Sequence, residues 1–167
     1  MDTMEYRRIR EPGGTYFFTV VLADRSSALL TDNVEILREA FQQTKAAMPF
    51  ALVAAVVLPE HLHCIWRLPE NDADYPRRWQ YLKAGFSRKL PRSASRTPSK
   101  AKKGERGIWQ RRYWEHLVRD ERDMHRHLDY IHYNPVKHGL VERVRDWSYS
   151  SFHRYVGRGY YDLDWGD

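Results

Sequence analysis

Only one cysteine occurs among the 167 residues of the chain, Cys64, and it lies inside an apolar run. A single cysteine cannot form a disulfide within the chain and is typical of proteins from a reducing compartment. Burial as a small apolar side chain is the simplest interpretation of its position.

Long hydrophobic runs are missing as well. The longest nearly continuous apolar run, residues 50–58, is far too short to span a bilayer. The opening residues MDTMEYRRIREPGG have no apolar segment behind their charges, so they do not form a signal peptide. We therefore expect a cytoplasmic protein without membrane contact. Glycine and proline are not enriched, with 9 Gly and 8 Pro, which favours a folded chain.

Aromatic and basic residues are abundant. Aromatic side chains make up 14% of the sequence, the formal net charge is +6 and the isoelectric point is about 9.5. A basic surface points toward a polyanion such as nucleic acid, although charge alone is weak evidence. The length fits one compact domain with a sizeable core.

Hydrophobic periodicity predicts an α+β domain in which helices pack on an antiparallel sheet. Strands are predicted at 15–22, at 50–68 with a break at Pro59-Glu60, and at 109–118, where the start of a helix is the alternative. Helices are predicted at 33–47 with Thr31 or Asp32 as cap, at 75–90, and at about 120–134 with Pro135 as stop. A basic loop at 91–107 and an irregular aromatic tail at 146–167 complete this single domain, 1–167.

The pair His61 and His63 is the first candidate for chemistry. Residues two apart in a strand point to the same face, so both imidazoles could bind one divalent ion while Leu62 enters the core. The alternative is a pair of exposed or merely hydrogen-bonded histidines on a sheet surface.

The predicted helix at 120–134 supplies the second candidate. At about 100° per residue, His127, Tyr130 and Asn134 fall on one shoulder of its apolar stripe. A tyrosine on a helix is more often a packing residue, so this arrangement alone decides little. The apolar stripe consists of Met124, Leu128 and Ile131.

Together these residues suggest phosphodiester chemistry. A divalent metal held by His61, His63 and the amide oxygen of Asn134 would polarise a phosphate oxygen, and Tyr130 would attack the phosphorus. A free phenol has a pKa of about 10 and needs such activation at neutral pH. His127 could position Tyr130 or accept its proton, or it could be a structural histidine.

Longer motifs carry a resemblance to a known family. LPEHLHCIW with Tyr-x-x-x-Asn-Pro downstream, YRRIREPGGTYFFTV, IWQRRYWEH and DYIHYNPVKHGLV resemble the HUH endonuclease superfamily, and within it the REP-associated tyrosine transposases. The resemblance implies that His61, His63 and Asn134 bind Mg²⁺ or Mn²⁺ and that Tyr130 is the nucleophile. It also implies a 5′-phosphotyrosine intermediate and a substrate hairpin from repetitive extragenic palindromes with a single-stranded flank.

Two basic regions are candidates for DNA contact, besides the loop at 91–107. Near the N-terminus these are Tyr6, Arg7, Arg8 and Arg10 beside Gly13 and Gly14, where the backbone can approach a hairpin closely. In the tail, Arg154 and Arg158 alternate with aromatic residues, as in proteins that stack unpaired bases.

Two other functions are compatible with these residues. One is a domesticated protein that binds palindromic repeats without mobilising DNA, and the other is a hydrolase that activates water and forms no covalent intermediate. The working unit is expected to be a monomer or a homodimer.

Overall fold

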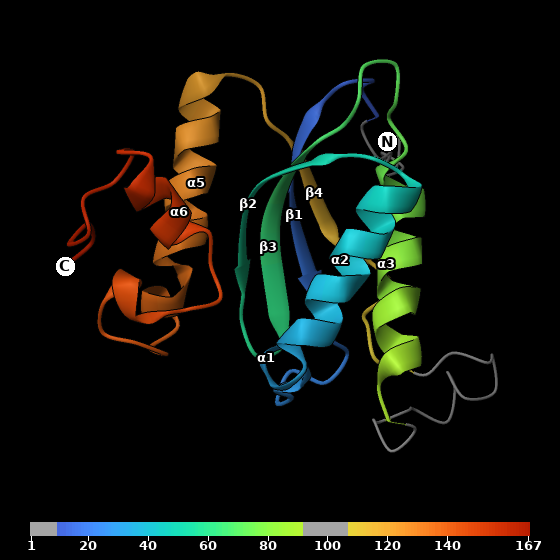
Figure 1. The fold of residues 1–167 in the computed structure, drawn as a ribbon, viewed down its shortest axis with the longest axis horizontal. Coiled ribbons are helices and arrows are strands. Elements are labelled where there is room, and N and C mark those ends of the chain that lie inside the picture. Colours follow the sequence, from blue (N-terminus) through green and yellow to red (C-terminus); the bar gives the residue numbers. More distant parts are fainter. Residues whose placement is uncertain (1–9, 92–106) are drawn as a thin grey trace, which may run out of the picture.

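A four-stranded antiparallel sheet forms the middle layer of the molecule, with the strand order β2-β3-β1-β4. The computed structural model describes residues 10–91 and 107–167, so the basic loop predicted at 91–107 lies almost wholly outside the described residues. The strands are β1 (Thr15–Val21), β2 (Ala51–Val57), β3 (His61–Arg67) and β4 (Trp114–Leu117). Helices cover both faces of the sheet (Figure 1).

One face of the sheet packs against α2 (Val34–Ala47) and α3 (Tyr75–Lys89), and the turn α1 (Leu29–Asp32) precedes them. Alternate residues of the central strands β1 and β3 enter this core, because successive side chains of a strand point to opposite faces of the sheet. Most of them are β-branched or aromatic, and such side chains pack well on a pleated buried surface. Trp66 of β3 stacks on Trp79 of α3 with 4.2 Å between ring centroids. Cys64 is fully buried here, and burial raises the pKa of its thiol, as expected for an inert cysteine.

The opposite face packs against α5 (Glu121–Lys137) and the C-terminal tail. Figure 1 shows α5 and the tail on the other side of the sheet from α2 and α3. The tail contains the 3₁₀ turn η1 (Val144–Asp146) and the helix α6 (Phe152–Gly157). The prediction of an irregular tail was therefore wrong in part, since Phe152 and Tyr155 anchor a short helix in this second core.

Helix α5 continues past Pro135, which was expected to stop it. A proline removes one hydrogen bond of the helix and its ring crowds the carbonyl four residues earlier, but the turn after it can still form when the following amides find carbonyl partners. Those amides do so: Leu140 N–H donates to the Pro135 carbonyl at 3.0 Å, and Gly139 N–H donates to that of Val136 at 2.9 Å. Gly139 has a φ of +71°, and this left-handed residue ends the helix.

The N-cap predicted for the helix at 33–47, which is α2 in the structure, was also wrong. Thr31 and Asp32 belong to the separate turn α1, and Asn33 stands at the N-cap of α2 without a side-chain cap bond. The ambiguous segment at 109–118 forms the edge strand β4 at its second half. Within the described residues, no helix is both long and apolar enough to cross a membrane.

Candidate functional site

His61 and His63 lie on the face of β3 that meets α5. They stand opposite Val21 and Thr19 of β1, while Leu62 belongs to the core on the other face. Their exposed fractions are 5% and 3%, and 5.0 Å separates their ring centroids. The strand alternation thus brings both imidazoles to one place, and that place is buried rather than on an open sheet surface.

Each imidazole is oriented by a hydrogen bond at Nδ1. The Glu60 carboxylate lies 2.5 Å from Nδ1 of His61, and the Thr19 hydroxyl lies 2.7 Å from Nδ1 of His63. Arg25 in turn holds Glu60 through an ion pair of 2.9 Å. When Nδ1–H donates to these oxygens, the lone pair of each ring resides on Nε2, the arrangement typical of metal-binding histidines.

Burial keeps both rings neutral. It lowers the pKa of His63 to about 3, and the positive charges of His61, His138 and Lys137 act in the same direction. Burial also lowers the pKa of His61, although Glu60 opposes this shift. At neutral pH both residues therefore present the uncharged imidazole that a divalent cation binds.

Tyr130 lies beside this pair. Its ring meets the ring of His63 edge to face, with 5.2 Å between centroids and 74° between planes. The residue is 39% exposed, so a substrate can reach it from solvent. The Lys137 ammonium lies over the tyrosine ring, 4.8 Å from its centroid, so a cation contacts the face of this phenol.

Asn134 occupies the next turn of α5 and is fully buried. Neither Oδ1 nor Nδ2 of its amide has a hydrogen-bond partner among the described residues, and the same holds for Nε2 of His63. Buried polar atoms without partners are rare and costly, and they call for an explanation such as an ion. Imidazole nitrogens and an amide oxygen are donors of the kinds that a divalent metal accepts.

His127 contacts Asp123 and forms no hydrogen bond with Tyr130. Its Nδ1 lies 2.8 Å from the backbone oxygen of Asp123 and 3.2 Å from Oδ1 of the same residue. The ring of Phe17 contacts both aromatic neighbours, with centroids 4.7 Å from His127 and 5.9 Å from Tyr130. His127 therefore reaches Tyr130 through Phe17 rather than by a hydrogen bond of its own.

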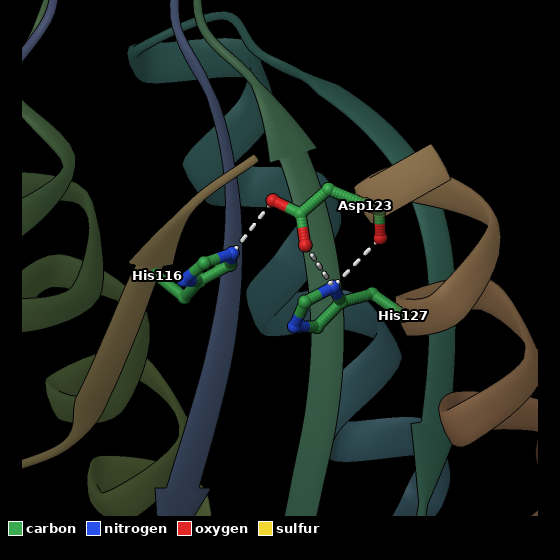
Figure 2. A group of neighbouring side chains, drawn as sticks. All are labelled: His116, Asp123 and His127. Atoms are coloured by element: carbon green, nitrogen blue, oxygen red, sulfur yellow. Dashed lines mark hydrogen bonds and ion pairs between the residues drawn. The ribbon is translucent and has the colours of Figure 1, made fainter. Parts of the chain in front are cut away.

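His116, Asp123 and His127 form a group that could bind a metal ion (Figure 2). Each offers one ligand atom, and these atoms lie within 4.8 Å of one another. Sequence reasoning missed His116 and Asp123, because it had no means to pair β4 with the first turn of α5.

Other neighbours of the site were missed too. The ring centroid of His138 lies 5.2 Å from that of His61. His138 comes after Pro135, where the helix was expected to end. Thr19 and Phe17 come from β1, so only the strand register reveals them. Glu60 was the one neighbour with a signal, since it directly precedes His61.

The predicted N-terminal DNA contacts lie at and before the turn into β1. Tyr6, Arg7 and Arg8 lie outside the described residues, and Arg10 is exposed. Gly13 has a φ of +69°, which favours glycine. A Cβ at Gly14 would come within 2.9 Å of the Glu11 carbonyl oxygen. Both glycines thus have a structural reason besides any approach of DNA.

Arg154 and Arg158 are exposed on and just after α6. Both guanidinium groups lie near the ring of Tyr155, at 5.9 and 5.8 Å from its centroid. Arg154 also donates to the carbonyl of Val53 at 3.1 Å, which fixes its direction. They form a small basic patch around Tyr155, whose hydroxyl donates to the Val53 carbonyl of the edge strand β2.

Comparison with known proteins places the chain in a family. A Haemophilus influenzae protein assigned to the REP-associated tyrosine transposases is 52% identical over 162 residues, which cover 96% of this chain and 92% of that protein. The REP-associated tyrosine transposase of Escherichia coli is 48% identical over 161 residues, or 96% and 90% of the two chains. The chain belongs to the REP-associated tyrosine transposases. No family model matches the chain.

A solved REP-associated tyrosine transposase has the same fold. That structure, of the protein bound to a REP hairpin, is 47% identical and has a TM-score of 0.84, covering 99% of this chain and 92% of that chain. The predicted fold class, one α+β domain with an antiparallel sheet, is confirmed. As a tyrosine transposase, the protein is an enzyme of the class that cuts and rejoins DNA.

Proposed function

We propose that this REP-associated tyrosine transposase cleaves and rejoins single-stranded DNA at REP-type hairpins, with Tyr130 as the nucleophile. The observation that carries the proposal is the contact of the Tyr130 ring with His63, whose Nε2 is buried without a partner among the described residues. A reactive phenol and a free imidazole lone pair at one spot suit nucleophilic catalysis at a phosphate.

The covalent step exchanges one phosphate ester for another. Oη of Tyr130 forms a bond to phosphorus, and the bond from phosphorus to the 3′ oxygen of the preceding nucleotide breaks. The phenol loses its proton and the departing 3′ oxygen gains one, so the products are a 5′-phosphotyrosine and a free 3′ hydroxyl. Attack by a 3′ hydroxyl on the phosphotyrosine reverses the exchange and rejoins DNA.

Mg²⁺ or Mn²⁺ is the proposed cofactor, held by Nε2 of His61, Nε2 of His63 and Oδ1 of Asn134. Bound there, the cation supplies Lewis-acid stabilisation of the phosphate charge. Thr19 and Glu60 keep the two rings turned with Nε2 free, and Lys137 favours the negative charge that develops on Tyr130. For His127 we propose positioning of Tyr130 through Phe17.

The DNA partner is proposed to be a REP-like hairpin with a single-stranded flank. Support comes from the solved relative, which is bound to a REP hairpin, and from the net charge of +6. Tyr6, Arg7, Arg8 and Arg10 with Gly13 and Gly14, and Arg154 with Arg158, are the proposed contacts. The proposal includes one domain over 1–167, a cytoplasmic location, and a monomer or homodimer as the working unit.

Cleavage of a labelled hairpin oligonucleotide in the presence of Mn²⁺ tests this function. Wild-type protein should form an adduct that survives denaturing electrophoresis, and Tyr130→Phe should form none while it binds the hairpin with unchanged affinity. Tyr133→Phe is the matched control, because Tyr133 lies on the same helix and is 41% exposed.

The two alternative functions give different results in the same assay. A domesticated binder would hold the hairpin without forming an adduct in any variant. A hydrolase that activates water would cut the DNA even as Tyr130→Phe. Either result would overturn the assignment of Tyr130 as the nucleophile.

A further inference from the structure

We propose that His116, Asp123 and His127 form a second metal site, separate from the one at His61 and His63, for a transition-metal dication such as Zn²⁺. The three residues come from β4 and from the first two turns of α5. An ion bound there would clamp the start of α5 to the edge strand of the sheet.

The carboxylate of Asp123 lies between the two imidazoles (Figure 2). Its Oδ2 is 2.8 Å from Nε2 of His116, and its Oδ1 is 3.2 Å from Nδ1 of His127. An ion about 2.1 Å from each ligand needs ligand atoms about 3–4 Å apart. The ligand atoms of this group lie within 4.8 Å of one another, so small side-chain rotations suffice to enclose an ion.

The surroundings hold the three side chains in place. Arg119 N–H donates to Oδ2 of Asp123 at 3.0 Å. Burial raises the pKa of this carboxyl, but the hydrogen bonds from Arg119 and His116 outweigh it and hold the pKa below its usual value. The two imidazole rings are stacked, with 4.6 Å between centroids. Side-chain exposure is 28% for His116, 16% for Asp123 and 22% for His127, so an ion can enter while most of the site is shielded.

The donor set selects the kind of ion. Two histidines and one carboxylate suit Zn²⁺, Co²⁺ and similar transition-metal ions. Without metal, the nitrogen of a neutral His116 that faces Asp123 carries the ring proton. On binding, that proton moves to the other ring nitrogen and the lone pair turns to the ion.

Phe17 separates this site from the other one. Its ring centroid lies 4.7 Å from that of His127 and 5.5 Å from that of His63. The two sites therefore share a neighbour and no ligand, and each can be removed by mutation without altering the donors of the other.

Metal content of the untagged full chain tests the proposal. Metal-free protein is dialysed against ZnCl₂ and its zinc is counted by mass spectrometry. We expect two bound ions in the wild type, one in His116→Gln/His127→Gln and one in His61→Gln/His63→Gln. The control His125→Gln, an exposed residue of the same helix, should retain two.

Cobalt gives a second reading that does not depend on counting. His61→Gln/His63→Gln protein loaded with CoCl₂ should keep the visible absorption of an imidazole-bound Co²⁺, and the further loss of His116 and His127 should remove it. Unchanged zinc in His116→Gln/His127→Gln, or no metal in His61→Gln/His63→Gln, overturns the proposal. Circular dichroism establishes that each variant is folded. Because metal content is measured rather than cleavage, these outcomes are independent of the role of Tyr130.

Discussion

The phenol ring of Tyr130 on α5 meets the imidazole ring of His63 on β3 edge to face, with 5.2 Å between their centroids. A strand and a helix that are distant in the sequence thus contribute to one site. The strand delivers imidazoles fixed by their neighbours, and the helix delivers a half-exposed phenol.

Thr19→Val should weaken the response to metal. The substitution removes the 2.7 Å hydrogen bond at Nδ1 of His63 and frees the ring to rotate or to change tautomer. Loss of such a bond to a metal-binding histidine typically costs about 10–100-fold in metal affinity. The Mn²⁺ concentration for half-maximal adduct formation should rise by about that factor. Thr15→Val, on the same strand, is the control and should respond as the wild type does. An unchanged Mn²⁺ requirement in Thr19→Val would show that this hydrogen bond does not matter.

Asn134→Leu should stabilise the protein when metal is absent. Both polar atoms of the buried Asn134 amide lack a partner among the described residues, and a leucine of similar size removes that cost. We expect the free energy of unfolding in urea with EDTA to rise by about 1–2 kcal/mol. Any stabilisation by Mn²⁺ should disappear in the same variant.

Asn33→Leu provides the contrast for this prediction. The Asn33 amide donates to the Leu29 carbonyl at 2.9 Å, so its loss should not stabilise the fold. A metal-free Asn134→Leu protein less stable than the wild type would mean that the amide has a structural partner after all.

Stability should fall as the pH drops from about 6.5 toward 4, in part because of His132. Burial, and secondarily the charge of Arg154, lowers the pKa of this histidine from 6.5 to about 4. In that window the unfolded chain binds the proton and the folded chain does not, so acid favours unfolding. The contribution of His132 to the free energy of unfolding is fully present above pH 6.5. About 2 kcal/mol of it is lost by pH 5.

Urea unfolding of His132→Asn between pH 5 and 7.5 measures this contribution. The variant is expected to be less stable at neutral pH, because His132 contacts Ser151 and Tyr161, but its stability should vary less with pH. His125→Asn should keep the wild-type slope. Equal slopes in His132→Asn and the wild type would assign the effect to other groups.

Arg78→Lys should destabilise the fold by about 3 kcal/mol. Arg78 is 2% exposed and forms a two-pronged ion pair with Asp72, at 3.0 and 2.8 Å, besides bonds to three backbone carbonyls. A lysine keeps the charge but cannot reproduce this planar set of donors. Arg77→Lys, at the exposed neighbouring position, should change the free energy of unfolding by less than about 0.5 kcal/mol. Similar urea midpoints for the two variants would contradict the prediction.

The sequence predicted those parts of the fold that depend on local periodicity. Trp79, Leu82 and Phe86 are all fully buried on α3, and the turn at Pro59-Glu60 separates β2 from β3 as expected. The end of α5 was missed, because a proline was taken as the stop when Gly139 supplies the left-handed residue that ends the helix.

Only part of the candidate site was predicted, because local patterns in the sequence do not show which strands pair. His61, His63 and Tyr130 come from spacing and resemblance, and in the structure the His63 ring lies beside the rings of both His61 and Tyr130. Thr19, Phe17 and His116 belong to other strands, and their approach depends on strand pairing that no local pattern contains. His138 was hidden by the misplaced helix end.

The C-terminal tail has a consequence for how copies of this protein could associate. The tail runs along the outer side of β2 and bonds to its backbone. The Val57 N–H donates to the Tyr149 carbonyl, and the Ser151 N–H donates to the Ala55 carbonyl. The Tyr155 hydroxyl donates to the Val53 carbonyl. A strand whose outer groups are already bonded offers no template for another chain. Because β4 is the other edge of the sheet, any sheet shared between two molecules would have to be joined through this four-residue strand.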